Sequence, residues 1–409
     1  MKCLLHIGTE KTGTTVLQEW LYANREALSE RGLYLPIASG VPNSRKFCAF
    51  CQDAYDDYFR ARSIDDEQAR RAYFDGFIQE LADELELARA SHDAVLLTSE
   101  HFSSRLKSQE EIACLKDVLQ TMLGPASAID IVCYVREQAS LINSLYSTAL
   151  LNGSTASIRD FYTDPSIHDP YFNYELMLQN WSAVFGSENV KLRLYDRAKL
   201  TGGDVRQDFL AVVLPNAKFS DFNPEKSTSN TAISQLQTLL LRLINQFGPL
   251  FEKEGGFNGN RSEMVDLVTG NKLLEVGVVR QDGRENIRLK FQVPNVNLFR
   301  RYLGVEDNLF FEESAPPSKE ECNDLVLDYG QQEALLQTLE ALFRDLKSNT
   351  SHEPSIRLEP NVIDFFRDVA LKYESGEPVS KHDAVRLMEF AQKGRPEGHV
   401  IQRFLKDHR

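Results

Sequence analysis

A glycine-containing stretch close to the first residue carries the residues best suited to bind an anion. Residues 3–21 read CLLHIGTEKTGTTVLQEWL, in which a short apolar run meets a turn rich in small and polar residues. Backbone N–H groups of such a turn, followed by a helix N-terminus, form a cradle for a phosphate-like group. The hydroxyls of Thr12, Thr14 and Thr15 add donors to this turn, and Lys11 adds a positive charge. The stretch therefore predicts an anion-binding loop.

The lysine of this loop does not stand where a nucleotide-hydrolysing P-loop places it. The pattern G-x-x-x-x-G-K-[ST] has its lysine directly after the second glycine. Gly8 and Gly13 have this spacing, but Thr14 follows Gly13, and Lys11 comes three residues before that slot. Glu100 follows a later apolar run and could hold the magnesium ion that such an enzyme needs. A P-loop kinase or nucleotide hydrolase with a displaced lysine is therefore an alternative.

A second candidate phosphate site follows another strand-like run. The run AIDIVCYV at 128–135 is followed at once by Arg136, and Ser144 comes eight positions later in a helix-like segment. The planar guanidinium of an arginine suits a phosphate. A serine two turns into the following helix can donate one more hydrogen bond to the same charged group. Arg136 and Ser144 are therefore predicted to bind one phosphate together.

Two residues suited to proton transfer follow a third apolar run. Glu100 and His101 come directly after AVLLTS at 94–99, and either side chain could take a proton from a reacting hydroxyl. One of them could instead only position the other or begin a helix. His6 precedes the loop inside an apolar run, so we expect a packed core histidine there.

The pattern of apolar runs predicts the elements that position these residues. Strands are expected at 2–7, 94–99, 128–135 and 189–195, and helices from Thr15 onward and at 65–91, 137–151 and 234–247. The run at 189–195 alternates apolar and basic residues, which favours a place near the edge of the sheet. Strands separated by helical segments predict an α/β fold with a mostly parallel sheet and helices on both faces. Ligands of such sheets bind at the carboxyl ends of the strands, where the loop, Glu100 and Arg136 all lie.

The loop and the strand-end arginine together resemble the PAPS-dependent sulfotransferases. KTGTT at 11–15 resembles their 5′-phosphosulfate loop, and Arg136 with Ser144 resembles their 3′-phosphate site. The resemblance implies a P-loop-like three-layer fold and transfer of a sulfuryl group from PAPS to a hydroxyl, with PAP as product and no metal ion. It implies that Lys11 stabilises the leaving oxygen. It implies that the donor is bound by Lys11, Thr12, Gly13, Thr14, Thr15, Arg136 and Ser144. Tyr195 either approaches the adenine of the donor or only packs against its neighbours, and both readings are kept.

Two further stretches, STSNTAISQLQTLLLRLIN and VNLFRRYLG, resemble bacterial carbohydrate-type sulfotransferases. That type tends to use a glutamate as base, so Glu100 is the first choice and His101 the second. The acceptor is expected to be a saccharide or glycolipid, in a pocket built from the aromatic-rich segments 40–70 and 150–180. The Arg-Lys-Gly loop of cytosolic sulfotransferases is not found. Four basic residues could substitute for it, although each is expected to be a solvated surface charge: Arg261, Arg284, Arg288 and Lys290.

The composition of the chain limits its expected partners and its expected location. The chain has 409 residues, of which 42% are apolar and 26% charged, and a formal net charge of −14. This charge argues against nucleic acid or an anionic membrane as partner. No signal peptide and no apolar stretch of about 18 residues is evident, so a cytoplasmic protein without a membrane span is expected.

The six cysteines include one isolated C-x-x-C motif, formed by Cys48 and Cys51. All six are expected to be reduced thiols without a metal or redox role.

The sequence predicts a sulfotransferase domain at 1–346, a linker at 347–360 and a helical C-terminal extension at 361–409. Whether the chain forms a homo-oligomer is left open. A non-catalytic module that binds PAP, and binds a partner through its C-terminal helices, is the third reading of the chain.

Overall fold

The computed structural model describes residues 1–161, 164–224, 233–248, 258–277, 284–310, 327–349, 360–376 and 379–409. Its contacts divide the chain into two compact units. Unit 1 comprises Met1–Leu141, Asp164–Asn230 and Gly283–Ser314, and unit 2 comprises Ile142–Thr163, Thr231–Asp282 and Ala315–Arg409. Each unit is described by itself.

Unit 1 is built on a five-stranded, all-parallel sheet with the strand order β2-β3-β1-β4-β5. The strands are β1 (Lys2–His6), β2 (Leu33–Tyr34), β3 (Ala94–Thr98), β4 (Ile129–Val135) and β5 (Val190–Leu194). The four predicted strands are confirmed, and β5 lies at an edge as its mixed pattern indicated. β2 was not predicted, because a strand of two residues has no periodicity to detect.

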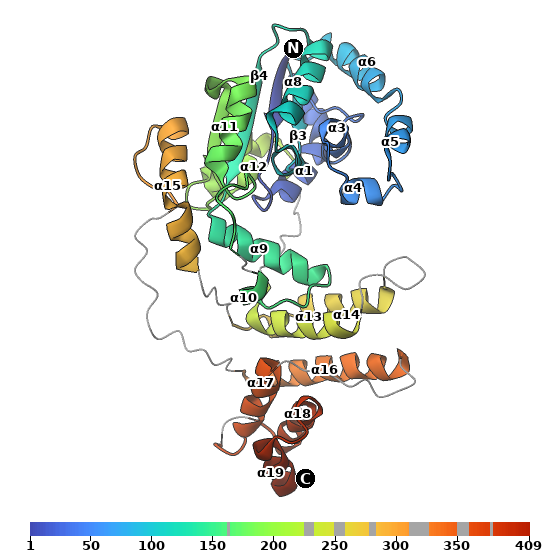
Figure 1. The fold of residues 1–409 in the computed structure, drawn as a ribbon, viewed down its shortest axis with the longest axis vertical. Helices are drawn as coiled ribbons and strands as arrows, with labels where there is room; N and C mark the ends of the chain where they lie inside the picture. Colours follow the sequence, from blue (N-terminus) through green and yellow to red (C-terminus); the bar gives the residue numbers. More distant parts are fainter. Residues whose placement is uncertain are drawn as a thin grey trace. The chain divides into compact units, whose positions relative to one another are not determined.

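Helices cover both faces of this sheet (Figure 1). On one face, α1 (Thr14–Ala23) and α12 (Val205–Val213) share a core with Leu4 of β1 and Val132 of β4. On the other face, α8 (Gln109–Leu123) and α11 (Tyr174–Phe185) pack against each other. All seven residues of β4 are buried, as expected of a parallel strand covered on both sides. The predicted three-layer α/β fold is confirmed.

The connection from β2 to β3 differs in detail from the prediction. It contains α3 (Arg45–Cys51), α4 (Asp57–Arg60), α5 (Glu67–Tyr73) and α6 (Phe77–Arg89). The single helix predicted at 65–91 is thus two helices. Gly76 caps the second of them at φ +71°, a left-handed conformation that glycine adopts without steric cost. The short α2 (Arg25–Ser29) follows α1, and α7 (His101–Arg105) follows β3.

Unit 2 is helical. It contains α10 (Ile158–Phe161), α13 (Gln235–Phe247), α14 (Gly259–Thr269), α16 (Tyr329–Asn349), α17 (Pro360–Leu371), α18 (Lys381–Gly394) and α19 (His399–His408). Helix α9 (Gln138–Leu151) begins in unit 1 and continues into unit 2. The range 252–290 contains α14 and the start of α15 (Arg284–Leu303).

The C-terminal helices share one hydrophobic core with earlier segments of unit 2. Phe366, Leu387 and Phe404 are buried with Leu240 of α13 and Leu335 of α16. The structure thus joins these helices to a larger helical unit, and the boundaries predicted at 346 and 361 stay a prediction. Among the described helices, none is both long and apolar enough to cross a bilayer.

Candidate active site

The loop between β1 and α1 is tied to the neighbouring strand. Thr9 donates its backbone N–H to the carbonyl of Tyr134 over 2.7 Å, and its hydroxyl donates to the same oxygen over 3.1 Å. The Thr12 hydroxyl donates to the Thr9 carbonyl over 2.6 Å. Its hydrogen is thus used inside the loop in this structure, and binding of the donor by Thr12 stays a prediction. The bonds from Thr9 to Tyr134 hold the loop on β4.

Three residues of the loop, Gly8, Lys11 and Gly13, have a positive φ. Lys11 has φ +62°, and Gly13, the N-cap of α1, has φ +75°. A Cβ on Gly13 would lie 3.0 Å from the ring of Tyr195, so only glycine fits there without a shift. Thr14 is buried and Thr15 is exposed at the first turn of α1. A strained lysine at a glycine turn is the kind of conformation that gathers at binding sites.

The loop touches the end of β3 at Gly8. A Cβ on Gly8 would lie 2.8 Å from the Cα of Glu100, and Gly8 has φ +94°. Gln18 of α1 donates its amide to the Glu100 carboxylate over 2.8 Å. Glu100 is therefore held beside the loop, as predicted from its place at a strand end.

We expect Gly8→Ala to disable this junction. The added Cβ meets backbone and the residue keeps a left-handed φ, so the substitution should cost about 2–3 kcal/mol of stability and weaken anion binding. Gly76→Ala is the matched control, because Gly76 has φ +71° with nothing within 4 Å of the added Cβ. Urea unfolding of both variants separates the cost of the clash from that of the φ angle. Equal losses of stability would contradict the close approach of Gly8 to Glu100.

Three further groups gather at the same edge of the sheet. Arg136, directly after β4, donates from Nη1 to the Lys11 carbonyl over 3.2 Å. Its guanidinium carbon lies 5.8 Å from the centre of the Tyr195 ring, within cation–π range. Burial lowers the pKa of Lys11; Glu10 and Glu100 oppose this effect, and Arg136 adds to it. Lys11, Glu100, Arg136 and Tyr195 are thus brought together.

Ser144 belongs to unit 2, whereas Lys11, Glu100, Arg136 and Tyr195 belong to unit 1. It is on α9 within unit 2, where its carbonyl accepts a hydrogen bond from the Thr148 hydroxyl over 3.2 Å. Its pairing with Arg136 on one phosphate stays a prediction.

His101, the second predicted base, begins α7 beside Glu100. Its Nδ1 is buried with no hydrogen-bond partner among the described residues. Burial lowers the pKa of His101, against the charge of Glu100, and the cations Arg45 and Arg105 lower it further. The imidazole is therefore neutral near neutral pH and could accept a proton.

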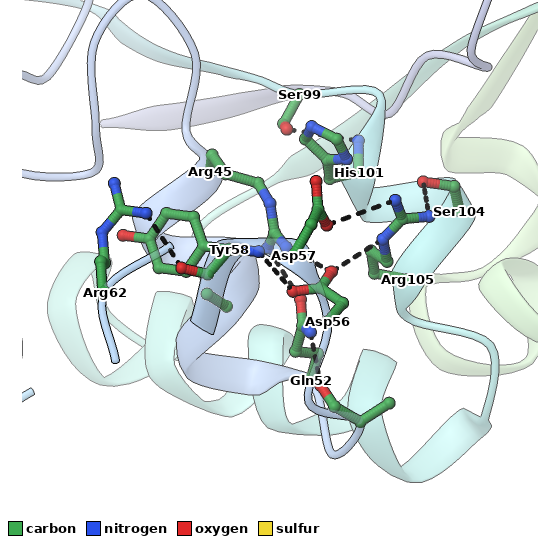
Figure 2. Close-up of polar contacts among 12 residues, drawn as sticks. Arg45, Gln52, Asp56, Asp57, Tyr58, Arg62, Ser99, His101, Ser104 and Arg105 are labelled. Atoms are coloured by element: carbon green, nitrogen blue, oxygen red, sulfur yellow. Dashed lines mark hydrogen bonds and ion pairs between the residues drawn. The ribbon is translucent and has the colours of Figure 1, made fainter. Parts of the chain in front are cut away.

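A cluster that sequence reasoning missed lies next to His101 (Figure 2). Asp56 accepts from Arg45 Nη2 over 2.5 Å and from Arg105 Nε over 2.9 Å. Burial opposes ionisation of Asp56, but Arg45, Gln52 and Arg105 prevail and lower its pKa. No short motif could reveal this cluster, because its members are separated by up to sixty residues of chain.

The cluster reaches the loop through Glu10. Arg105 Nη1 lies 3.5 Å from one oxygen of Glu10, and the Tyr171 hydroxyl donates to the other over 2.7 Å. A small pocket opens here, lined by Thr9, Glu10, Ser103, Leu141, Tyr171 and Met177. Of the aromatics expected to line an acceptor pocket, Phe47, Phe59 and Tyr174 are fully buried instead. Tyr162 lies outside the described residues.

The four basic candidates for a substitute phosphate loop have other partners. Arg284 and Arg288 pair with Glu137, the residue that follows Arg136, over 3.0 and 2.9 Å. Lys290 pairs with Asp164. Arg261 is 4% exposed and donates to the Leu151 carbonyl over 2.7 Å within unit 2. The expectation of a solvated surface charge is therefore wrong for Arg261, which satisfies the C-terminal end of α9.

His6 is buried on β1, as expected of a core histidine. Its Nδ1 bonds with the Thr98 hydroxyl over 2.8 Å, and burial lowers the pKa of His6 to about 3. Between pH 6.5 and about 3 the unfolded chain binds a proton that the native state excludes, so stability falls as pH falls. The free energy of unfolding should therefore fall between pH 7 and pH 4. We expect His6→Asn to reduce this fall by up to a few kcal/mol, measured by urea unfolding at both pH values. An unchanged slope would contradict a neutral buried His6.

Among the described residues, no group of three or more His, Cys, Asp or Glu side chains is placed to hold a metal ion. Independence from a metal ion stays a prediction.

Comparison with known proteins assigns no activity. No family model matches the chain. A curated protein of Archaeoglobus fulgidus, described as an uncharacterized protein, is 28% identical over 186 residues, which are 45% of this chain and 48% of the relative. The chain thus spans about half the length of this relative. The crystal structure of a sulfotransferase from Alicyclobacillus acidocaldarius is similar over 48% of this chain and 73% of that chain, with 18% identity and a TM-score of 0.29.

Proposed function

We propose that the chain is a PAPS-dependent sulfotransferase that transfers a sulfuryl group to a hydroxyl of a saccharide or glycolipid. The observation that carries this proposal is the gathering of Lys11, Glu100 and Arg136 at the carboxyl ends of three adjacent parallel strands. The ammonium of Lys11, the carboxylate of Glu100 and the guanidinium of Arg136 meet there beside a glycine turn. This set matches the needs of a donor with two anionic groups and an acceptor that must lose a proton.

The donor is proposed to bind along the loop. Backbone N–H groups of residues 10–13 and the N-terminus of α1 would hold the 5′-phosphosulfate, with Lys11 beside it. Arg136 would bind the 3′-phosphate, and its position near the ring of Tyr195 favours an adenine close to that ring. Thr14, Thr15 and Ser144 are retained as donors on the strength of the sequence resemblance.

The reaction is proposed to be an in-line displacement at sulfur. The acceptor oxygen forms a bond to sulfur while the bond between sulfur and the 5′-phosphate oxygen breaks. The acceptor's proton passes to Glu100, which Gln18 orients over 2.8 Å. Negative charge grows on the leaving phosphate oxygen, where the ammonium of Lys11 stabilises the transition state more than the ground state.

Incubation with sulfur-labelled PAPS and a panel of glycans, phenols and lipids tests the proposal. We expect label to move to a saccharide or glycolipid hydroxyl, and to stay on the donor with Glu100→Gln. Binding of PAP with no transfer to any acceptor, and no effect of Glu100→Gln on the biological role, would instead favour a non-catalytic module. Action in the cytoplasm and self-association stay predictions from the sequence.

A further inference from the structure

The segment that follows β2 lies beside the candidate base. In the sheet, β2 is next to β3, whereas β4 and β5, which precede Arg136 and Tyr195, lie on the other side of β1. Just before α3, the backbone N–H of Ser44 donates to the Thr98 carbonyl over 2.7 Å, and the backbone N–H of Thr98 donates to the Ser44 hydroxyl over 3.2 Å. The residues after β2 therefore flank Glu100 on the side away from Arg136.

One arginine of this segment is exposed and held in place. Arg62 follows α4, and its guanidinium carbon lies 3.7 Å from the centre of the Tyr58 ring. Its Nε donates to the Tyr73 hydroxyl over 3.2 Å, and its Nη1 donates to the Tyr58 carbonyl over 3.0 Å. No carboxylate of a described residue forms an ion pair with Arg62. The guanidinium is thus oriented by the protein without being neutralised by it.

We propose that Arg62 binds an anionic group, a carboxylate or a sulfate ester, of an acidic saccharide acceptor; this assignment rests on the proposed sulfotransferase function. A guanidinium binds such an oxyanion through parallel N–H donors. Arg62 uses two of its N–H groups within the protein, so further N–H groups are available to a ligand. A side chain already fixed by a ring, a hydroxyl and a carbonyl also loses less freedom on binding than a mobile one.

A chain of contacts connects Arg62 with the candidate site (Figure 2). The guanidinium carbon of Arg45 lies 4.6 Å from the centre of the same Tyr58 ring. Arg45 Nη2 donates to Asp56 over 2.5 Å, and Asp56 also accepts from Arg105 Nε over 2.9 Å. Arg105 is the last residue of α7, the helix that directly follows the candidate base. One aromatic ring therefore separates Arg62 from the cluster that borders this base.

Three other arginines of the same region have carboxylate partners. Arg45 and Arg105 both pair with Asp56. Arg71 of α5 is 79% exposed and pairs with Glu67 over 3.0 Å. These charges are offset within the protein, whereas the charge of Arg62 can act on a bound anion.

Binding to an oligosaccharide array tests the proposal without requiring sulfuryl transfer. The full chain is applied to neutral oligosaccharides, to the same oligosaccharides with uronic acid carboxylates, and to the same ones with sulfate esters. We expect an acidic form to bind about tenfold more tightly than its neutral counterpart, because of charge-assisted hydrogen bonds to the arginine. The two acidic arms distinguish a carboxylate from a sulfate ester. Equal or weaker binding of all acidic forms would overturn the proposal.

Variants of two arginines show which side chain reads the charge. Arg62→Gln should lower the affinity for the acidic form about tenfold, to that of the neutral form. Arg62→Lys should retain part of the preference, because it keeps the charge but not the planar fork. Arg71→Gln is the matched control and should leave every affinity unchanged. A preference for acidic forms that persists in Arg62→Gln, or in Arg62→Lys at full strength if the glutamine variant does not fold, would contradict the assignment.

The affinity for PAP separates this proposal from the proposed function. It is measured by thermal unfolding of the same natural chain. PAP binding without a preference for acidic saccharides would contradict the role of Arg62 alone. A preference that is lost in Arg62→Gln, in a chain that does not bind PAP, would support the anion site and contradict the sulfotransferase.

Discussion

Replacing Glu100 with glutamine is expected to lower kcat by about two to four orders of magnitude and to leave the affinity for PAP unchanged. Glutamine has the same shape and can still accept the hydrogen bond from Gln18, which spans 2.8 Å in this structure. It cannot take a proton from the acceptor hydroxyl. The loss should therefore appear in kcat rather than in donor binding, measured by initial rates with PAPS and by calorimetry with PAP.

His101→Asn is the matched comparison for this prediction. His101 is adjacent to Glu100, and burial first of all lowers the pKa of its imidazole, so it too could accept a proton near neutral pH. If Glu100 is the base, His101→Asn should reduce kcat much less than Glu100→Gln. The reverse ranking would transfer the role of base to His101. Equal, small effects of both changes would refute a proton acceptor at this strand end.

Replacing Lys11 with alanine is expected to lower kcat by about two to three orders of magnitude, as loss of a group that stabilises developing charge does. Alanine and lysine bear the same steric cost at φ +62°, so the backbone of the loop should be preserved. Arginine at this position should restore part of the rate, because it keeps the charge. Single-turnover rates with saturating PAPS measure the chemical step directly.

The control for Lys11 is a lysine of the same unit outside the site. Lys107 is 49% exposed and pairs with Asp169 over 3.4 Å. Lys107→Ala should leave the single-turnover rate unchanged. If Lys11→Ala raised KM with kcat intact, Lys11 would serve binding alone, and its place at the leaving oxygen would be wrong.

The fold could be predicted where strands are long and apolar. β1, β3 and β4 bury both faces and so stand out as continuous apolar runs that end at the loop, Glu100 and Arg136. The break between α5 and α6 was missed, because it depends on the left-handed backbone at Gly76. The shared core of unit 2 was missed for another reason: helices distant in sequence bury their apolar faces on one another, and no local pattern records the pairing.

The same limit applies to the candidate site. Lys11, Glu100 and Arg136 each follow a strand, so the parallel order of the sheet was enough to expect them together. The contact of Asp56 with Arg45 and Arg105 depends on how α3, α4 and α7 pack, which sequence spacing does not encode. Thr12 shows a further difference: its hydroxyl is a ligand donor by type, yet it bonds to Thr9 within the loop.

Thermal unfolding with PAP in a metal-free buffer, compared with Mg-ATP, tests the central claim most directly. A ligand at about a hundred times its Kd stabilises the native state by about 2.7 kcal/mol, which raises Tm measurably. We predict that PAP without magnesium raises Tm of the natural chain and not of Arg136→Ala, whose Tm without ligand serves as baseline. A rise in Tm with Mg-ATP and none with PAP would contradict the account and favour a nucleotide kinase or hydrolase.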